Sequence, residues 1–395
     1  MVAALSALNA LAIDVMLPAL PLIAADFQLT VENDRQFVII AYVALFGVAQ
    51  LIYGPLADAF GRRRVLIGAL GIYLFGSVLC VIAPNFELFL AARALQGLGA
   101  AATRVIATAV VRDMTSGRRM AQIMSMAMTV FMIVPIVAPS LGQLVLYVAP
   151  WRWIFGALLI YGLLVLAWAW LRLPETLAPE NRTPFRPRAI IGTYRAILSN
   201  RQTFGYAIAS TCLMGALFGY ITASEQIYVD VYNLGEAFPL AFGAVALAMS
   251  AGTLLNSRLV IKLGMRRISH TMTLWFIAAA LINAGLIITG ASTFWLFLAL
   301  LALTLGAFGM IAGNFNALAM EPAGRMAGSA SALYGGVTAI GGAVFGALVA
   351  RSFDGTVLPF LVCLVIVGFA TLIAVLWTER GRLFSAPGDA ASGKG

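Results

Sequence analysis

The sequence predicts an all-α membrane protein with twelve transmembrane helices arranged as two six-helix bundles. Three observations lead to this fold class. Of the 395 residues, 62% are hydrophobic and only 10% are charged, whereas soluble domains carry about 25% charged residues. The apolar residues gather into runs long enough to cross a membrane. The basic residues gather in the short intervals between those runs, as in membrane proteins with many spans.

Twelve apolar runs have about the length of 20 residues that a spanning helix needs. We expect helices at about 3–25, 37–57, 65–83, 87–110, 120–146, 152–171, 204–227, 237–261, 269–290, 294–316, 327–350 and 357–377. The first run begins at the start of the chain. Its length and the lack of a basic segment before it favour a retained helix over a cleaved signal peptide.

Arginines predict the orientation of the spans. The turn between the second and third runs contains Arg62, Arg63 and Arg64, and arginines in short loops mark the cytoplasmic side. This choice places both termini in the cytoplasm. It also places nineteen of the 25 lysines and arginines inside, three outside and three within spans. Orientation therefore explains the net charge of +9 better than a nucleic-acid partner does.

A polar interval divides the spans six and six. Residues 172–203 contain four prolines and six arginines, and we interpret them as a cytoplasmic linker that associates with the membrane surface. The predicted domains are thus a bundle at 1–171, the linker, a second bundle at 204–378 and a cytoplasmic tail at 379–395. Gly264 follows the eighth run as Gly61 follows the second, an offset of 203 residues. This repeat is typical of transporters whose substrate site lies between two halves.

Several function classes lack support in the sequence. Cys80, Cys212 and Cys363 lie far apart inside apolar runs, which favours packing over disulfides or metal binding. The one histidine, His270, is expected at the membrane interface. With no cysteine pair and no phosphate-binding loop, we expect no metal, no cofactor and no enzymatic activity. We expect a monomer whose partners are lipid, protons and a small molecule.

Four motifs resemble the major facilitator superfamily, and more narrowly its Bcr/CflA group of drug/proton antiporters. They are Ala12-Ile-Asp14-Val-Met-Leu-Pro18-Ala-Leu-Pro21, Gly54-Pro-Leu-Ala-Asp58-Ala-Phe-Gly61-Arg62-Arg63-Arg64, Arg93-Ala-Leu-Gln96-Gly97-Leu-Gly99 and Pro135-Ile-Val-Ala138-Pro139-Ser-Leu-Gly142. The resemblance covers essentially the whole chain. It implies the major facilitator fold, a gating loop in the second motif and proton-coupled export from the fourth- and fifth-helix motifs together.

The sequence departs from the family pattern in four places. Ala59 stands where a basic residue is common, and Ala138 and Gln143 replace frequent glycines of the fifth-helix motif. Ile261 stands where the second half would repeat Asp58, and Glu225 stands where the family often has proline. The last two departures predict that the halves are mechanically unequal.

Four ionisable residues within predicted spans are the candidate proton-coupling or substrate site: Asp14, Arg93, Arg104 and Glu225. Such residues cost about 2.5–3.5 kcal/mol each to insert, so they tend to face cavities. A carboxyl group at Asp14 in a low-dielectric cavity can hold a proton near neutral pH. The alternatives for Asp14 are pairing with a substrate cation, or a hydrogen bond that fixes the proline-bent helix.

Arg93 and Arg104 are eleven residues apart, which places them on one face of a helix with Gly97 and Ala100. A face of arginines and small residues predicts a cavity or a close helix contact. The resemblance links Arg93 to proton coupling, where a fixed cation helps a nearby carboxyl group to release its proton. Arg104 has a structural ion pair or an interfacial position as its alternative.

Glu225 lies near the outer end of the seventh run and is interpreted either as an interfacial residue or as a second titrating or substrate-binding carboxylate. The neighbouring Tyr220, Tyr228 and Tyr232 are expected in an interfacial aromatic belt.

Two further groups complete the predicted site. The gating loop comprises Gly54, Asp58, Gly61, Arg62, Arg63 and Arg112, in which Asp58 is expected to accept from Arg112 or to face the start of the eleventh helix near Ala327 and Gly328. The antiporter helix comprises Pro135, Pro139 and Gly142, for which a tight seam against proton leakage and ordinary helix packing are both open.

These expectations together predict proton-coupled efflux of small amphipathic or cationic drugs across the bacterial inner membrane by alternating access. A facilitator or proton symporter for a small metabolite is the alternative. A receptor or membrane enzyme is disfavoured because the chain has neither a sizeable soluble domain nor a catalytic cluster.

Overall fold

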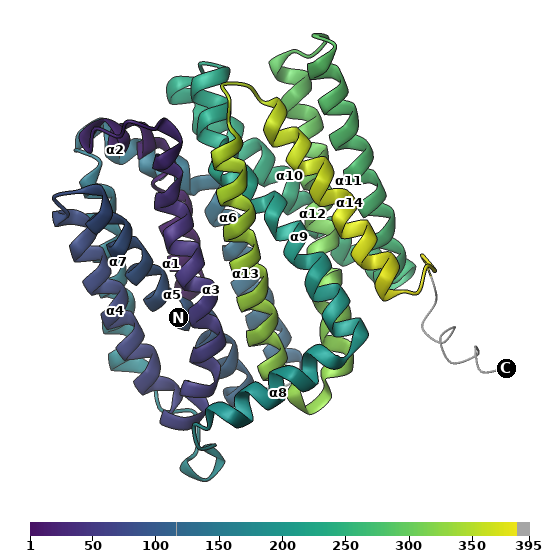
Figure 1. The fold of residues 1–395 in the computed structure, drawn as a ribbon. Helices are drawn as coiled ribbons and strands as arrows, with labels where there is room; N and C mark the ends of the chain where they lie inside the picture. The colour runs from purple at the N-terminus through teal and green to yellow at the C-terminus, as the bar shows by residue number, and fades with distance from the viewer. Residues whose placement is uncertain (116, 385–395) are drawn as a thin grey trace.

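The computed structural model describes residues 1–115 and 117–384, and these residues are almost entirely helical (Figure 1). The first half contains α1 (Val2–Asp14), η1 (Leu17–Ala19), α2 (Leu20–Asp26), η2 (Glu32–Gln36), α3 (Phe37–Phe60), α4 (Arg62–Ile82), α5 (Phe86–Met114), α6 (Gly117–Val148) and α7 (Arg152–Arg172). The second half contains α9 (Arg201–Glu225), η4 (Gln226–Val231), η5 (Gly235–Ala237), α10 (Phe238–Leu263), α11 (Met265–Ile288), α12 (Phe294–Met320), η6 (Glu321–Met326), α13 (Ala327–Ser352) and α14 (Leu358–Thr378). Between them lie η3 (Pro179–Asn181) and α8 (Pro187–Ser199).

The twelve-helix membrane fold is confirmed. Eleven helical segments of the described chain are long and apolar enough to span a membrane, and α6 contains a shorter apolar segment, Ile133–Val148. α6 itself runs for 32 residues without a break, although Pro135 and Pro139 lie inside it. Of the tail predicted at 379–395, residues 385–395 lie outside the described part of the chain.

The first predicted helix is interrupted, and the interruption follows from its prolines. α1 ends at Asp14, and the chain then passes through η1 into α2. Pro18 has no N–H to donate to the carbonyl of Asp14, and Pro21 has none for the carbonyl of Leu17, so the regular helical ladder cannot continue here. Asp14 consequently lies at the point where the first span changes direction.

Two pairs of long helices join the halves: α3 packs on α13, and α6 packs on α10. The α3–α13 seam is close because it uses small residues, as membrane helix contacts commonly do. A Cβ atom on Gly47 would lie 2.8 Å from the backbone nitrogen of Ile340. In Figure 1, α13 stands between the helices of the first half and α9, α11 and α14.

The predicted linker contains a helix, α8, which crosses one end of the molecule (Figure 1). Its apolar face packs through Ile197, Tyr194 and Leu198 on Ala330 and Leu333 of α13. We call this end, which also carries Gly61 and Gly264, the basic end. The other end carries η2 and is called the Arg35 end. α9 begins at Arg201, three residues before the start predicted at 204, so it includes the last residues of the predicted linker.

Candidate transport site

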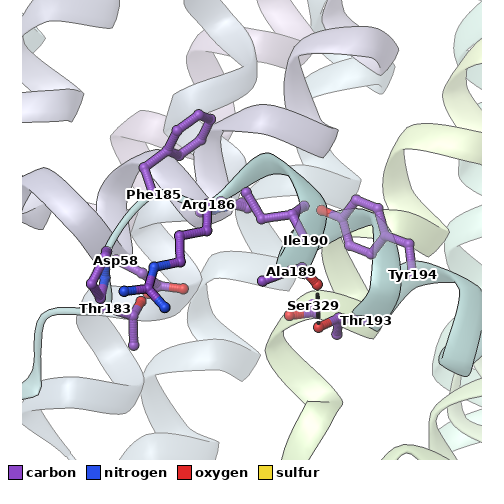
Figure 2. A pocket seen from close by; sticks show the side chains of 11 residues that line it. Asp58, Thr183, Phe185, Arg186, Ala189, Ile190, Thr193, Tyr194 and Ser329 are labelled. Atoms are coloured by element: carbon purple, nitrogen blue, oxygen red, sulfur yellow. Dashed lines mark hydrogen bonds between the residues drawn. The ribbon is translucent and has the colours of Figure 1, made fainter.

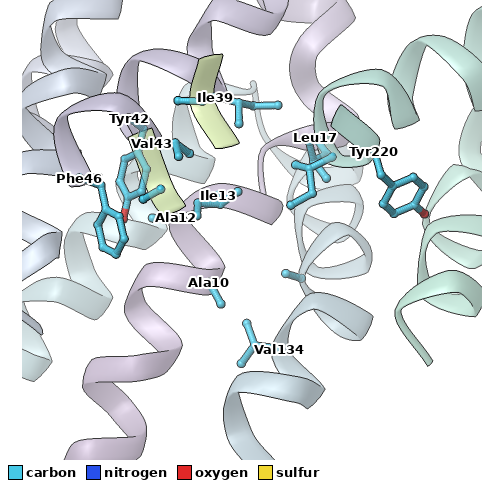
Figure 3. Packing of buried hydrophobic residues seen from close by; sticks show 14 of the residues in the cluster. Ala10, Ala12, Ile13, Leu17, Ile39, Tyr42, Val43, Phe46, Val134 and Tyr220 are labelled. Atoms are coloured by element: carbon cyan, nitrogen blue, oxygen red, sulfur yellow. The ribbon is translucent and has the colours of Figure 1, made fainter. Parts of the chain in front are cut away.

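Asp14 is buried at the break in α1, with 4% of the residue exposed. Its Oδ1 atom is enclosed and has no hydrogen-bond partner among the described residues. Side chains of α1, α3, α6 and α9 surround the break, including Ile13, Tyr42 and Tyr220 (Figure 3). Tyr42 donates to Oδ1 of Asn9 on α1 at 2.9 Å. A buried carboxyl oxygen without a partner is costly unless a proton or a cation occupies it in part of the working cycle.

Arg93 is fully buried beside this break but does not pair with Asp14. Its guanidinium donates to the carbonyls of Ala12 (3.0 Å) and Val38 (3.2 Å), and it lies over the ring of Tyr42 at 4.7 Å. The cation therefore ties α5 to α1 and α3 through backbone acceptors. Its acceptor on α1 is the carbonyl of Ala12, two residues before Asp14.

A polar chain that the sequence analysis missed holds Arg93 in place. Arg93 also donates to Oε1 of Gln96, and Gln96 Nε2 donates to Oγ of Ser77 at 2.8 Å. All three side chains are fully buried. Gln96 could have been selected from the sequence, because it belongs to the fourth-helix motif. Ser77 on α4 belongs to none of the four motifs, and no sequence pattern indicated its role.

Arg104 shares a helix face with Arg93 but has different surroundings. Its side chain is exposed, and it lies near enough to Tyr334 of α13 to interact electrostatically. Gly97, between the two arginines, is in the close helix contact that such a face predicts, because a Cβ atom there would lie 2.1 Å from the carbonyl oxygen of Tyr42.

The antiporter helix packs directly on the break in α1. A Cβ atom on Gly142 would lie 1.8 Å from the carbonyl oxygen of Val15 and 3.1 Å from Pro18. Six residues before Gly142, α6 also contacts α10. A Cβ atom on Gly243 of α10 would lie 3.3 Å from the carbonyl oxygen of Ile136. The α6 motif thus lies between the Asp14 segment and the other half.

Glu225 is fully buried and lies at the Arg35 end, where its Oε2 is 3.0 Å from Nε of Arg35. Tyr220 and Tyr228 do not belong to an interfacial belt, so that expectation was wrong for these two residues. Tyr220 and Tyr228 are buried with their hydroxyl groups 3.4 Å apart, and Tyr220 stacks on Phe242 at 5.3 Å. Their rings fill the core of the second half because its helices pack tightly around α9.

The gating loop forms an ion network at the basic end. Arg62 is 2.5 Å from Oδ1 of Asp58 and 3.1 Å from Oδ2 of Asp113, and its backbone N–H donates to Glu175. Gly61 has φ +96°, a conformation that side chains rarely adopt, and a Cβ atom there would lie 2.3 Å from Glu175. The glycine therefore allows the turn that brings Arg62 between Asp113 in the last turn of α5 and Glu175 after α7.

Arg112 is not the partner of Asp58, so that part of the gating prediction was wrong. The ionic partner of Asp58 is Arg62, while the Arg112 guanidinium lies against the start of α13, where a Cβ atom on Gly328 would be 3.1 Å from it. Arg63 donates to the carbonyl of Trp170. A Cβ atom on Gly54 would lie 3.6 Å from Ala332 of α13, so Gly54 belongs to the seam between the halves.

A cleft of about 210 Å³ opens beside Asp58. Its lining includes Arg186 and Tyr194 from the linker and Ser329 from α13 (Figure 2). Burial raises the pKa of Tyr194 to about 12, so its hydroxyl stays protonated and donates to the carbonyl of Leu51 at 2.8 Å. The linker thus contacts both halves at the basic end. Asp14 does not line this cleft.

The second half repeats the ion network with different residues. Arg266 follows the turn at Gly264, which has φ +80°, and lies 2.8 Å from Glu379 after α14 and 3.8 Å from Glu321 after α12. Ile261, in place of a second Asp58, is exposed. His270 is fully buried beside this network and bonds Tyr206 (3.2 Å). The expected interfacial position of His270 was therefore wrong.

No group of three or more potential metal ligands occurs among the described residues. The fold and the duplicated ion network define a membrane transporter built from two related halves. The family model for the Major Facilitator Superfamily matches residues 2–346, and the chain belongs to this family. It is accordingly a transporter and not an enzyme.

Relatives extend over most of the chain. It is 32% identical to an uncharacterized MFS-type transporter of Bacillus subtilis, covering 87% of this chain and 86% of that protein. It is 31% identical to a bicyclomycin resistance protein homolog of Haemophilus influenzae, covering 94% and 92%. The crystal structure of a D-xylose-proton symporter matches with a TM-score of 0.75 at 15% identity over 97% of both chains, a likeness of fold alone.

Proposed function

We propose that the protein exports small amphipathic or cationic drugs across the bacterial inner membrane in exchange for protons. The observation that carries the proposal is the buried Oδ1 of Asp14 at the break in α1, which has no hydrogen-bond partner in the described part of the chain. A proton and a substrate cation can each satisfy this oxygen, but not both at once, and such competition is the basis of exchange. The bicyclomycin resistance homolog, similar over nearly the whole chain, supports a drug as the substrate.

The remaining parts have roles in the same cycle. Arg93 holds the α1 break at a fixed place relative to α5 and α3. The α6 motif closes the space between the break and α10. The basic end faces the cytoplasm, because arginines in short loops stay on that side. The proton gradient supplies about 1.4 kcal/mol per pH unit, and the potential about 2.3 kcal/mol per charge per 100 mV.

A drug-susceptibility panel in an efflux-deficient bacterial host tests this function. We expect the wild-type protein to raise the inhibitory concentration of several amphipathic cations, and Asp14→Asn to return it to the level of the empty vector. Asp354→Asn is the matched control. The Thr356 hydroxyl donates to Asp354 and lowers the pKa of that exposed loop carboxyl group, so Asp354 stays ionised near neutral pH.

Expression of each variant is measured in membranes by immunoblot. Resistance that persists in Asp14→Asn at wild-type abundance would contradict the role of Asp14. A wild-type protein that protects against no compound, while accumulating in the membrane, would contradict drug export.

A further inference from the structure

We propose that Arg35 is the lock that holds the two halves together at the Arg35 end of the transporter. Arg35 belongs to η2 in the first half, and both of its ionic partners belong to the second half. Its Nε is 3.0 Å from Oε2 of Glu225 at the end of α9, and its Nη2 pairs with Asp230 of η4. The inference deepens the proposed transport cycle and rests on it only for the existence of two alternating states.

Neighbouring amides reinforce the contact. Gln36 donates to Oε2 of Glu225 at 3.3 Å. Gln226, the residue after Glu225, donates to Oδ1 of Asn33 at 2.6 Å, and Asn33 in turn donates to the carbonyl of Phe353 at 3.2 Å. Arg35, Gln36, Glu225 and Gln226 are all buried. Each of these hydrogen bonds joins a residue of the first half to a residue of the second.

Arg35 differs from all other arginines in the ion pairs of the described residues. The pairs of Arg62 and Arg152 stay within the first half, and the pairs of Arg266 stay within the second. Only the pairs of Arg35 join the halves in this part of the chain. The α3–α13 seam, by contrast, has close packing at small residues and an uncharged hydrogen bond from Gln50 to the carbonyl of Gly335 at 3.4 Å. These contacts impose no charge requirement when the helices separate.

Burial makes the Arg35 ion pairs important for the state in which the halves are in contact at the Arg35 end. Removing one member of a buried ion pair leaves the other charge without compensation, which strongly disfavours the buried arrangement. Without Arg35, the fully buried carboxylate of Glu225 would lose its cation, and it would reach water only by separation of the halves. The side chain of Asp230 is 32% exposed and is already in contact with water. Tyr147, which donates to Glu236 at 2.9 Å between α6 and η5, is exposed and holds this end less strongly.

The proposal also assigns Glu225 a role that the sequence left open. Its carboxylate is the acceptor of the lock and a positioning residue, not a member of the Asp14 site. Arg351, the remaining cation at the end of α13, lies over the ring of Phe37 at 5.4 Å and does not substitute for Arg35.

Double electron–electron resonance on the full chain in lipid nanodiscs tests the lock. Spin labels are placed on Glu87→Cys and Ala291→Cys, exposed positions on the two halves at the Arg35 end, in a background where Cys80, Cys212 and Cys363 are replaced by serine. We expect a predominantly short distance for the parent protein. Arg35→Gln should increase the ratio of long to short distances by at least about tenfold, and Glu225→Gln should shift it in the same direction.

Arg152→Gln is the matched control, because Arg152 pairs with Asp26 at the same end but within one half. It should leave the distance distribution unchanged. An unchanged distribution in monodisperse Arg35→Gln and Glu225→Gln proteins, or an equal shift in Arg152→Gln, would overturn the proposal. The distances are measured without substrate or a proton gradient. The lock can therefore be confirmed or rejected even if the resistance panel shows no drug export.

Discussion

At the scale of single residues, Asp14 lies at a break in the first span that depends on Pro18 and Gly142. Proline at position 18 removes the hydrogen bond that would continue the helix past Asp14, and Gly142 lets α6 approach the freed segment at Val15. The carboxyl group therefore lies beside irregular backbone inside a packed bundle. In membrane transporters such interrupted helices are found where the backbone lines a binding site.

The approach of α6 to the break gives a residue-scale prediction. Gly142→Ala should displace α1 or α6, because its Cβ atom would lie 1.8 Å from a backbone oxygen that cannot rotate away. We expect a loss of stability of about 1–3 kcal/mol, measured as a lower Tm in detergent, together with reduced drug resistance. Gly285→Ala on α11 is the control, since no atom lies within 4 Å of its Cβ position. Equal Tm values for the two variants would contradict the close contact.

At the scale of elements, the glycine turns after α3 and α10 were predictable and their partners were not. The repeat at an offset of 203 residues located Gly61 and Gly264, and both adopt positive φ. The acids that meet the arginines, such as Asp113 and Glu379, lie at the ends of other helices. Their positions depend on how helix ends gather in three dimensions, which no local pattern contains.

The same reason explains the errors in the predicted elements. His270 and Tyr220 lie near the ends of apolar runs, where interfacial positions are common, but both are fully buried in the folded protein. Arg35 was not selected as a site residue from the sequence, because its ionic partner Glu225 lies 190 residues later in the chain. By contrast, Asp14 and Arg93 were selected because they are ionisable residues inside apolar runs, and Gly142 was selected through the fifth-helix motif.

Because Asp58 is partly exposed, its substitution should affect gating much more than the stability of the protein. Its side chain is 44% exposed, and Arg62 keeps Asp113 when Asp58 is lost. Asp58→Asn should therefore change stability by no more than about 1 kcal/mol while abolishing drug resistance. Tm and membrane abundance are measured beside the resistance assay, and Glu180→Gln, an exposed acid of the linker, is the control. Unchanged resistance at normal abundance would remove the gating role of Asp58.

For the whole molecule, the contacts between the halves describe how alternating access is arranged. α3 packs on α13 and α6 packs on α10. Arg35 joins the halves at one end, and the linker crosses from α3 to α13 at the other. Charged groups that must separate are confined to the ends, while the middle of the molecule holds Asp14 and Arg93. Rocking of the halves thus changes access to Asp14 without disturbing the contacts of Arg93, which lie within the first half.

Proton flux in proteoliposomes tests the central claim most directly. Purified protein is reconstituted with a pH-sensitive dye inside the vesicles, and a cation selected by the resistance panel is added without an imposed gradient. We predict that wild-type vesicles move protons in the direction opposite to the substrate, and that Asp14→Asn vesicles move none while Asp354→Asn vesicles behave as wild type. Substrate transport without proton movement, or undiminished proton movement in Asp14→Asn, would contradict exchange at Asp14.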